Sequence, residues 1–241
     1  KLSGLGGTNA RLGNGEFIVV EADEFDRTFL KLTPTIAALT TLESEHLDTY
    51  KDLDDIKSAF IEFANKVPFY GFVTLCLDEP ALQDIMPQIN KKIITYGLNV
   101  QADVRATDIT HNGFTSSYKV KYFGNEIGEI TLKIPGKHNI NNSLVAVVIG
   151  KELGVDFKII KSALESFSGV YRRFEVKYNK EILVIDDYAH HPTEATATLK
   201  AIRDGWDRRL VAVFQPHLYS RTRDFYQEFG RAFLNSDLFI C

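Results

Sequence analysis

The chain has 241 residues, of which 44% are hydrophobic and 25% are charged, as is typical of a globular protein with a buried core. Its formal net charge of −4 argues against an overall basic field for nucleic acid or an anionic membrane. No apolar run reaches the roughly 18 residues of a membrane-spanning helix, and no secretory segment opens the chain. Cys76 and Cys241 do not make a disulfide framework, so we expect a cytoplasmic protein.

Strands alternate with helices in the first hundred residues. The apolar runs predict strands over 16–21, 35–41, 72–77 and 92–96. Between them we expect an amphipathic helix over 53–67 and a short helix after Pro80. This alternation predicts a parallel sheet with right-handed crossovers. Alternating polar and apolar residues then predict an antiparallel meander, which we expect to form a small sheet beside the main one, over 104–110, 115–123 and 129–134.

Two helices, 139–153 and 157–167, lead to a boundary at 168–170. We therefore expect a central domain over 1–168 and a second domain over 169–241. The second domain is predicted to contain, in order, a hairpin (174–178 and 182–185), a helix (192–204), a strand (209–215), a helix (220–235) and the start of a strand (237–241). The fold class is α/β: a parallel-sheet, ATPase-like central domain with a small antiparallel sheet, followed by a truncated Rossmann-like domain.

The segment Asp186-Asp187-Tyr188-Ala189-His190-His191 carries the strongest local signal. It follows four apolar residues that we expect to form a buried strand, and Pro192 opens the next helix. Ligands of open α/β sheets bind at the carboxyl ends of strands, so these side chains stand where chemistry is usual. The alternative for a single acid, a solvated turn with a helix cap, is less favoured for two acids followed by two histidines.

Glu21 and His46 each close a predicted core strand. A carboxylate and an imidazole on adjacent strands are able to hold one Mg²⁺ when phosphates supply further ligands. A cluster of acids that caps the next helix explains the same residues equally well.

Asn139 and Asn142 are three residues apart, hence on one helical face, where paired amides are able to read an adenine edge. On composition alone, a simple helix cap at Asn139 is the commoner outcome. The Arg172-Arg173 pair directly follows the boundary, and a guanidinium there is able to reach phosphate across a cleft, although a solvated charge run is commoner.

His217 and Arg221 lie where a strand gives way to a helix. With the helix N-terminus they form a candidate site for a carboxylate or phosphate. The alternative is that Ser220 merely caps the helix.

Six of these stretches, in this order, resemble the motifs of the Mur ligases, the ATP-dependent amide-forming enzymes of peptidoglycan synthesis. The last two favour the member that adds L-alanine. The motifs are Glu-Ala-Asp-Glu-x-Asp at 21–26, Glu-x-x-His-Leu-Asp at 43–48, Gly-x-His-Asn-x-x-Asn at 136–142, Arg-Arg-Phe-Glu at 172–175, Asp-Asp-Tyr-Ala-His-His-Pro-Thr-Glu at 186–194, and Phe-Gln-Pro-His-x-Tyr-Ser-Arg-Thr at 214–222.

The resemblance implies roles for individual positions. Glu21 and His46 match Mg²⁺-binding positions, and Asn139 and Asn142 match positions near the adenine of ATP. Arg173 and Asp187 match positions that reach phosphate and ribose. The positions that match those holding the incoming amino acid are His190, His191, His217 and Arg221. By the same resemblance, His46, Arg173, His190 and His191 are the residues implied to take part in catalysis.

The resemblance further implies that UDP-N-acetylmuramate and L-alanine are the substrates, joined through an acyl phosphate. Two positions depart from the family pattern: Thr41 replaces a frequent Asn, and Leu218 replaces a commonly basic residue, which shifts amino-acid binding toward Arg221 and Arg223. No Gly-Lys-[Ser/Thr] phosphate loop occurs in the chain. We therefore expect a fragment that is inactive alone.

Three other functions remain open on the sequence. A metal-dependent hydrolase would use Glu21, His46 and the Asp-Asp/His-His segment as ligands on one sheet edge. A non-catalytic binding protein descended from a ligase would suit the missing phosphate loop. A Mur ligase that adds another amino acid is the nearest alternative.

Overall fold

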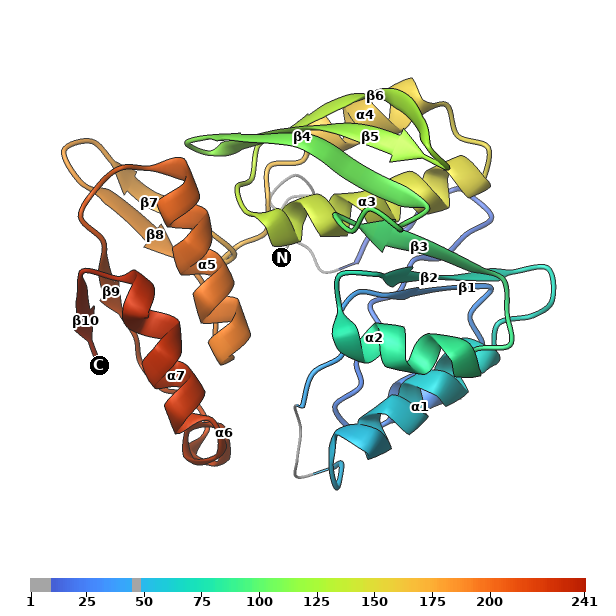
Figure 1. Ribbon diagram of the computed structural model, residues 1–241, viewed down its shortest axis with the longest axis horizontal. Helices are drawn as coiled ribbons and strands as arrows, with labels where there is room; N and C mark the ends of the chain where they lie inside the picture. Colours follow the sequence, from blue (N-terminus) through green and yellow to red (C-terminus); the bar gives the residue numbers. More distant parts are fainter. Residues whose placement is uncertain (1–9, 45–48) are drawn as a thin grey trace.

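The computed structural model describes residues 10–44 and 49–241. These residues form two lobes, joined near residue 168 (Figure 1). We call the described residues up to 168 the N-terminal lobe, and residues 169–241 the C-terminal lobe. Each lobe contains its own cluster of buried apolar side chains. The division into domains at 168 and 169 stays a prediction.

A six-stranded sheet forms the centre of the N-terminal lobe. In spatial order its strands are β1 (Ile36–Leu39), β2 (Phe72–Cys76), β3 (Ile93–Gly97), β4 (Val104–Asn112), β5 (Thr115–Tyr122) and β6 (Asn125–Leu132). Strands β1 to β4 pair in parallel, and β4 to β6 pair antiparallel. The predicted α/β class is confirmed.

The antiparallel meander is present, but it extends the main sheet and does not lie beside it. Tyr96 of β3 pairs in parallel with Val104 of β4, and Gly97 pairs with Arg105. An alternating pattern indicates which face of a strand is buried, but not which strand its edge will meet. The sequence therefore predicted the three strands of the meander, but not the parallel pairing of β4 with β3.

Helices cover both faces of this sheet (Figure 1). On one face α3 (Lys137–Glu152) packs on β2, β3 and β4, and α4 (Phe157–Ser166) packs on β6. On the other lie α1 (Leu53–Asn65) and α2 (Pro80–Ile85), with the short 3₁₀ helices η2 (Thr28–Lys31) and η3 (Met86–Gln88). Asp52 caps α1 by accepting the Asp55 N–H at 2.9 Å. Among the described residues, no helix is long and apolar enough to cross a membrane.

The strand predicted over 16–21 is absent, which is a correction to the sequence analysis. These residues have no regular secondary structure, and Ile18 and Val19 are 88% and 96% exposed. An apolar run has the propensity for a strand, but a strand is stable only where a neighbour completes its hydrogen-bond ladder. Among the described residues, no strand pairs with this segment, and β1 is the edge of the sheet.

The C-terminal lobe contains two separate two-stranded sheets. They are the antiparallel hairpin of β7 (Glu175–Asn179) and β8 (Leu183–Asp186), and the parallel pair of β9 (Val211–Val213) and β10 (Leu238–Ile240). Helix α5 (Pro192–Gly205) begins at the predicted proline. The buried core of this lobe is small: Ala195, Leu199, Ala212, Phe229, Ala232 and Phe233.

Two further expectations for this lobe were wrong. The strand before Asp186 is only partly buried, since Ile182 and Val184 are 63% and 41% exposed. Among the described residues, β7 and β8 form a separate two-stranded sheet, so no further strand covers their edges. The helix predicted over 220–235 is divided into α6 (Tyr219–Asp224), α7 (Tyr226–Ala232) and η4 (Phe233–Asn235). The break falls at Phe225, whose ring packs against His191 with centroids 5.0 Å apart. Tertiary packing here overrides helical periodicity.

The two lobes touch through the tip of the β4–β5 hairpin and the end of α5. Phe114 packs edge-on against Trp206, with ring centroids 4.7 Å apart. Trp206 is also stacked with Phe174 of the C-terminal lobe at 6.0 Å. Gly113 and Gly205 lie backbone to backbone, since a Cβ on Gly205 would come within 2.9 Å of the Gly113 oxygen. This contact fixes one side of the cleft between the lobes.

Candidate functional site

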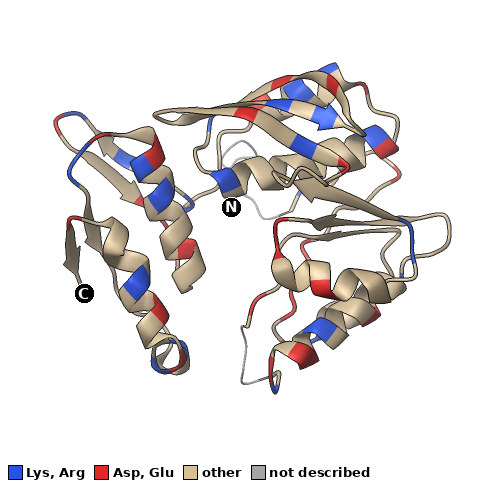
Figure 2. Ribbon diagram, viewed as in Figure 1, with Lys and Arg blue, Asp and Glu red and all other residues tan. Residues whose placement is uncertain are grey.

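A cleft with a volume of about 900 Å³ lies between the lobes. Its lining contains most of the candidate residues from the sequence, and they come from four separate stretches of the chain. The lining includes the polar residues Glu21, Glu43, Asn139, Asn142, Arg173, Asp187, His191, Glu194 and Thr198. Acidic and basic residues are interspersed along the ribbons of both lobes (Figure 2).

Asn139 and Asn142 both line the cleft from the first turns of α3, as their spacing predicts. The alternative that Asn139 caps the helix is wrong, because the N-cap is Gly136, which has a φ of 100°. Asn139 instead donates from Nδ2 to the Pro135 carbonyl at 2.7 Å, which fixes the orientation of its amide. The remaining polar atoms of the two amides are therefore available to a ligand in the cleft.

Glu21 lines the cleft, but its predicted metal-binding partner His46 lies outside the described residues. Within residues 10–44 and 49–241, no three His, Cys, Asp or Glu side chains come together as a metal site. Burial, with the carboxylates Glu43 and Asp78 nearby, raises the pKa of Glu79 at the carboxyl end of β2.

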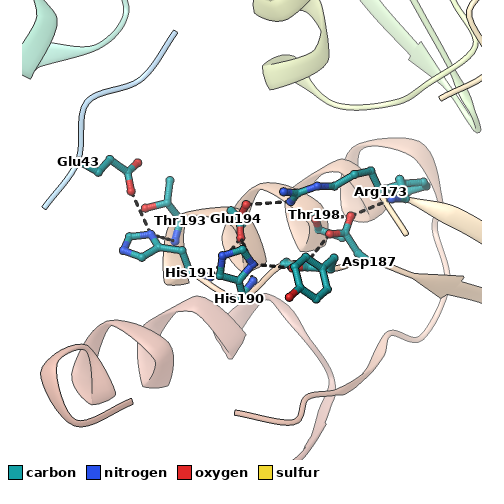
Figure 3. A network of polar contacts seen from close by, with 11 residues as sticks. Glu43, Arg173, Asp187, His190, His191, Thr193, Glu194 and Thr198 are labelled. Atoms are coloured by element: carbon teal, nitrogen blue, oxygen red, sulfur yellow. Dashed lines mark hydrogen bonds and ion pairs between the residues drawn. The ribbon is translucent and has the colours of Figure 1, made fainter. Parts of the chain in front are cut away.

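Asp187 joins three parts of the C-terminal lobe (Figure 3). Its carboxylate accepts the backbone N–H of Phe174 at 2.9 Å and that of Ala189 at 2.8 Å. It also accepts the hydroxyl of Thr198, on α5, at 3.1 Å. Of the two consecutive acids, Asp187 is the one that lines the cleft, whereas Asp186 lies 3.5 Å from Nε of Arg172. Its predicted contact with ribose or phosphate stays a prediction.

Arg173 also lines the cleft, and its Nη1 donates to Oε1 of Glu194 at 2.8 Å (Figure 3). The other oxygen of Glu194 accepts the N–H of His190 at 2.8 Å and that of His191 at 3.2 Å. Burial raises the pKa of the Glu194 carboxyl, but the His190 N–H and the Arg173 guanidinium outweigh burial, so its pKa lies below the ordinary value. Glu194 was not predicted as a site residue. Its signal is the capping-box spacing, three residues after the N-cap His191.

The two adjacent histidines have different surroundings. His191 is 6% exposed, caps α5, and places Nδ1 3.0 Å from Oε2 of Glu43 in the opposite lobe (Figure 3). The same Nδ1 also lies 3.4 Å from the backbone nitrogen of Thr193. When Nδ1 carries a proton it donates to Glu43, and when Nδ1 has no proton it accepts from the Thr193 N–H. His190 instead places its Nδ1 2.8 Å from the Tyr188 carbonyl. The helix-cap alternative thus holds for His191, together with a contact across the cleft that the sequence did not reveal.

His217 and Arg221 do not line the cleft. His217 is exposed, and Arg221 is half-buried in the six-residue helix α6. The alternative that Ser220 caps this helix is wrong, because the N-cap is Leu218, with a φ of 68°. The role of His217 and Arg221 in holding an amino acid stays a prediction.

Two protein-family models match the chain. The model of the Mur ligase middle domain matches residues 8–150. The model described as Mur ligase, glutamate ligase domain, matches residues 172–241.

Curated relatives and solved structures give the same association. A protein of Geotalea uraniireducens named UDP-N-acetylmuramate–L-alanine ligase is 53% identical over 235 residues, which cover 97% of this chain and 51% of that protein. A protein of the same name from Persephonella marina is 53% identical and is covered to 50%. The crystal structure of UDP-N-acetylmuramate–alanine ligase from Thermotoga maritima, at 26% identity, has a TM-score of 0.74 and covers 90% of this chain and 48% of its own. The chain spans about half the length of the curated relatives it matches.

Proposed function

This chain belongs to the Mur ligase family, and we propose that it supplies the nucleotide-binding and amino-acid-binding parts of an enzyme that joins L-alanine to UDP-N-acetylmuramate. The six motifs predicted the family, and the two family models confirm it. The choice of L-alanine is supported by the names of relatives that are 53% identical. The absence of a Gly-Lys-[Ser/Thr] loop in the chain and the half-length coverage make the activity a property of the full-length protein.

One observation carries the proposal. The cleft brings Asn139 and Asn142 of one lobe to the same space as Arg173 and Asp187 of the other. Its volume of about 900 Å³ is within the range of roughly 300–1,000 Å³ usual for small-molecule sites. Amides on one side and a guanidinium on the other are suited to a base and to phosphates. We propose that ATP binds across this cleft.

Glu21 lines the cleft and supplies a carboxylate oxygen, the kind of ligand that Mg²⁺ prefers. We propose that Glu21 and His46 hold Mg²⁺. A bound Mg²⁺ would neutralise phosphate charge.

In the proposed reaction, the lactyl carboxylate of UDP-N-acetylmuramate attacks the γ-phosphate of ATP, and ADP leaves. The alanine amine then attacks the acyl phosphate, and inorganic phosphate departs. Two unit charges 4 Å apart repel by about 4 kcal/mol at an effective dielectric of about 20. Arg173 opposes this repulsion, since its guanidinium lies in the cleft and a single Nη1 contact ties it to Glu194.

The incoming amino acid belongs, in this proposal, on the C-terminal lobe, near His190 and His191, with His217 and Arg221 as outer contacts. Of these two adjacent histidines, His191 is among the residues that line the cleft. The cytoplasm is the proposed compartment, and two free cysteines, Cys76 and Cys241, suit reducing conditions.

An assay of amino-acid choice tests the function. The full-length protein is incubated with ATP, Mg²⁺, UDP-N-acetylmuramate and one amino acid at a time, and phosphate release is measured. L-Alanine should give the highest kcat/KM. If another amino acid gives a kcat/KM at least tenfold higher than L-alanine, that amino acid is the substrate instead. Phosphate release without any amino acid would contradict the ligase reaction.

The proposed metal site has a separate test. His46→Ala in the full-length protein should raise the Mg²⁺ concentration needed for half-maximal activity, because one of two protein ligands is lost. His111→Ala is the matched control, since His111 lies on β4, outside the cleft lining, and has no part in the proposed reaction. An unchanged Mg²⁺ titration for His46→Ala would remove this residue from the metal site.

A further inference from the structure

The backbone of Arg173 is well fixed, whereas the end of its side chain has few contacts. Its backbone N–H donates to the Val170 carbonyl at 3.1 Å, and the next N–H, that of Phe174, donates to Asp187 at 2.9 Å. The residues on either side, Arg172 and Phe174, have φ values of 56° and 51°. This is a left-handed backbone conformation that residues other than glycine rarely adopt. The backbone at Arg173 is therefore held in one shape.

The side chain, by contrast, extends into water. It is 48% exposed, and among the described residues its guanidinium hydrogen-bonds to Glu194. An arginine side chain that is free in solvent loses rotamer entropy when a ligand fixes it, and this loss weakens binding. A protein contact that fixes it beforehand removes part of that loss.

Glu194 is well suited to this task. It is fixed to the first turn of the 14-residue helix α5, because Oε2 accepts the N–H groups of His190 and His191. Oε1 remains for Nη1 of Arg173. One carboxylate thus joins the start of a helix to the cleft guanidinium (Figure 3).

We propose that Glu194 is a positioning residue for Arg173, which it holds extended toward the cleft for the phosphates of the nucleotide. This inference rests on the proposed function, in which Arg173 contacts ATP.

The opposite effect, competition between Glu194 and phosphate, is disfavoured by two features. A guanidinium has five N–H donors, and Glu194 engages one nitrogen, so several donors remain for phosphate. In addition, the charge of Glu194 is already stabilised by two backbone N–H groups at the N-terminus of α5. Phosphate therefore adds to the existing ion pair and does not displace it.

Glu194→Gln separates the two functions of the carboxylate. The amide oxygen of glutamine still accepts the N–H groups of His190 and His191, and its NH₂ group then faces the guanidinium, where two donors do not pair. The helix cap is kept and the contact with Arg173 is lost. Glu181→Gln is the matched control, since Glu181 lies in the turn of the β7–β8 hairpin and accepts the Tyr178 hydroxyl.

The experiment is a double-mutant cycle in the full-length protein, with Glu194→Gln, Arg173→Ala and both together. We expect Glu194→Gln to raise the KM for ATP about tenfold with kcat changed much less, and the midpoint of thermal unfolding to stay close to that of the control. In the Arg173→Ala background, Glu194→Gln should have no further effect on this KM.

Three results would overturn the inference. An unchanged or lower KM for ATP in Glu194→Gln would mean that Glu194 is neutral or competes with phosphate. An equal effect in the Arg173→Ala background would mean that Glu194 acts through the fold. If Arg173→Ala itself leaves the KM for ATP unchanged, the contact between Arg173 and ATP is wrong, and the proposed nucleotide site fails together with the inference.

Discussion

The two lobes hold their cleft residues by different means. In the N-terminal lobe, Asn139 and Asn142 stand on α3, which packs through buried residues such as Leu144 on a six-stranded sheet. In the C-terminal lobe, Arg173 and Asp187 stand on short segments over a small core, held by hydrogen bonds and an ion pair. Close packing is stiff, whereas exposed polar contacts are individually weak. We infer that substitutions in the N-terminal lobe mainly lower the free energy of unfolding. Substitutions in the C-terminal lobe should mainly change the positions of its cleft residues.

The largest expected effect is on the core of the N-terminal lobe. Leu144→Ala on α3, a fully buried position, should lower the free energy of unfolding by about 3 kcal/mol. Leu199→Ala on α5, 6% exposed in the small cluster, should lower it by about 2 kcal/mol, because the site is closer to solvent and collapses more easily. Urea unfolding of the two variants measures the difference. A larger loss for Leu199→Ala would reverse the comparison between the lobes.

The contact between the lobes should show an intermediate effect. Trp206→Ala removes the ring that packs on both Phe114 and Phe174, and aromatic pairs contribute about 0.5–1.5 kcal/mol each. We expect faster cleavage by protease near residues 168–171 and a wider range of lobe orientations in solution scattering. Trp206→Phe is the matched control and should keep most of the contact. Identical cleavage rates for Trp206→Ala and the unsubstituted protein would show that this contact does not hold the lobes.

The smallest expected effect is on the pH dependence of the C-terminal lobe. The pKa of Glu194 is lowered in the folded state, so its carboxylate stabilises the lobe above the unfolded pKa of about 4.3. This stabilisation is lost as the pH falls through the lower, folded pKa. Thermal unfolding followed from pH 7 to pH 3 should show a smaller decrease for Glu194→Gln than for the unsubstituted protein. Parallel curves for the two proteins would mean that Glu194 makes no net contribution.

The sequence predicted the features that depend on local chemistry. Pro192 marked the start of α5, the three-residue spacing placed Asn139 and Asn142 on one face, and the alternating pattern gave the β4–β6 meander. Each of these follows from backbone geometry over a few residues, which a single chain segment determines by itself.

The features it did not predict depend on which distant segments meet. Glu43 and His191 are remote along the chain, and their contact exists because the lobes face each other across the cleft. The break at Phe225 likewise follows from packing on His191, and the segment 16–21 lacks a strand because no described strand pairs with it. Periodicity contains no information on such partners.

The central claim is that a nucleotide occupies the cleft and touches both lobes. A crystal structure of the full-length protein with Mg²⁺ and a non-hydrolysable ATP analogue tests this most directly. The account predicts the adenine beside Asn139 and Asn142 and phosphate oxygens within hydrogen-bond distance of Arg173. A nucleotide bound outside this cleft, or one whose phosphates do not reach Arg173, would contradict it.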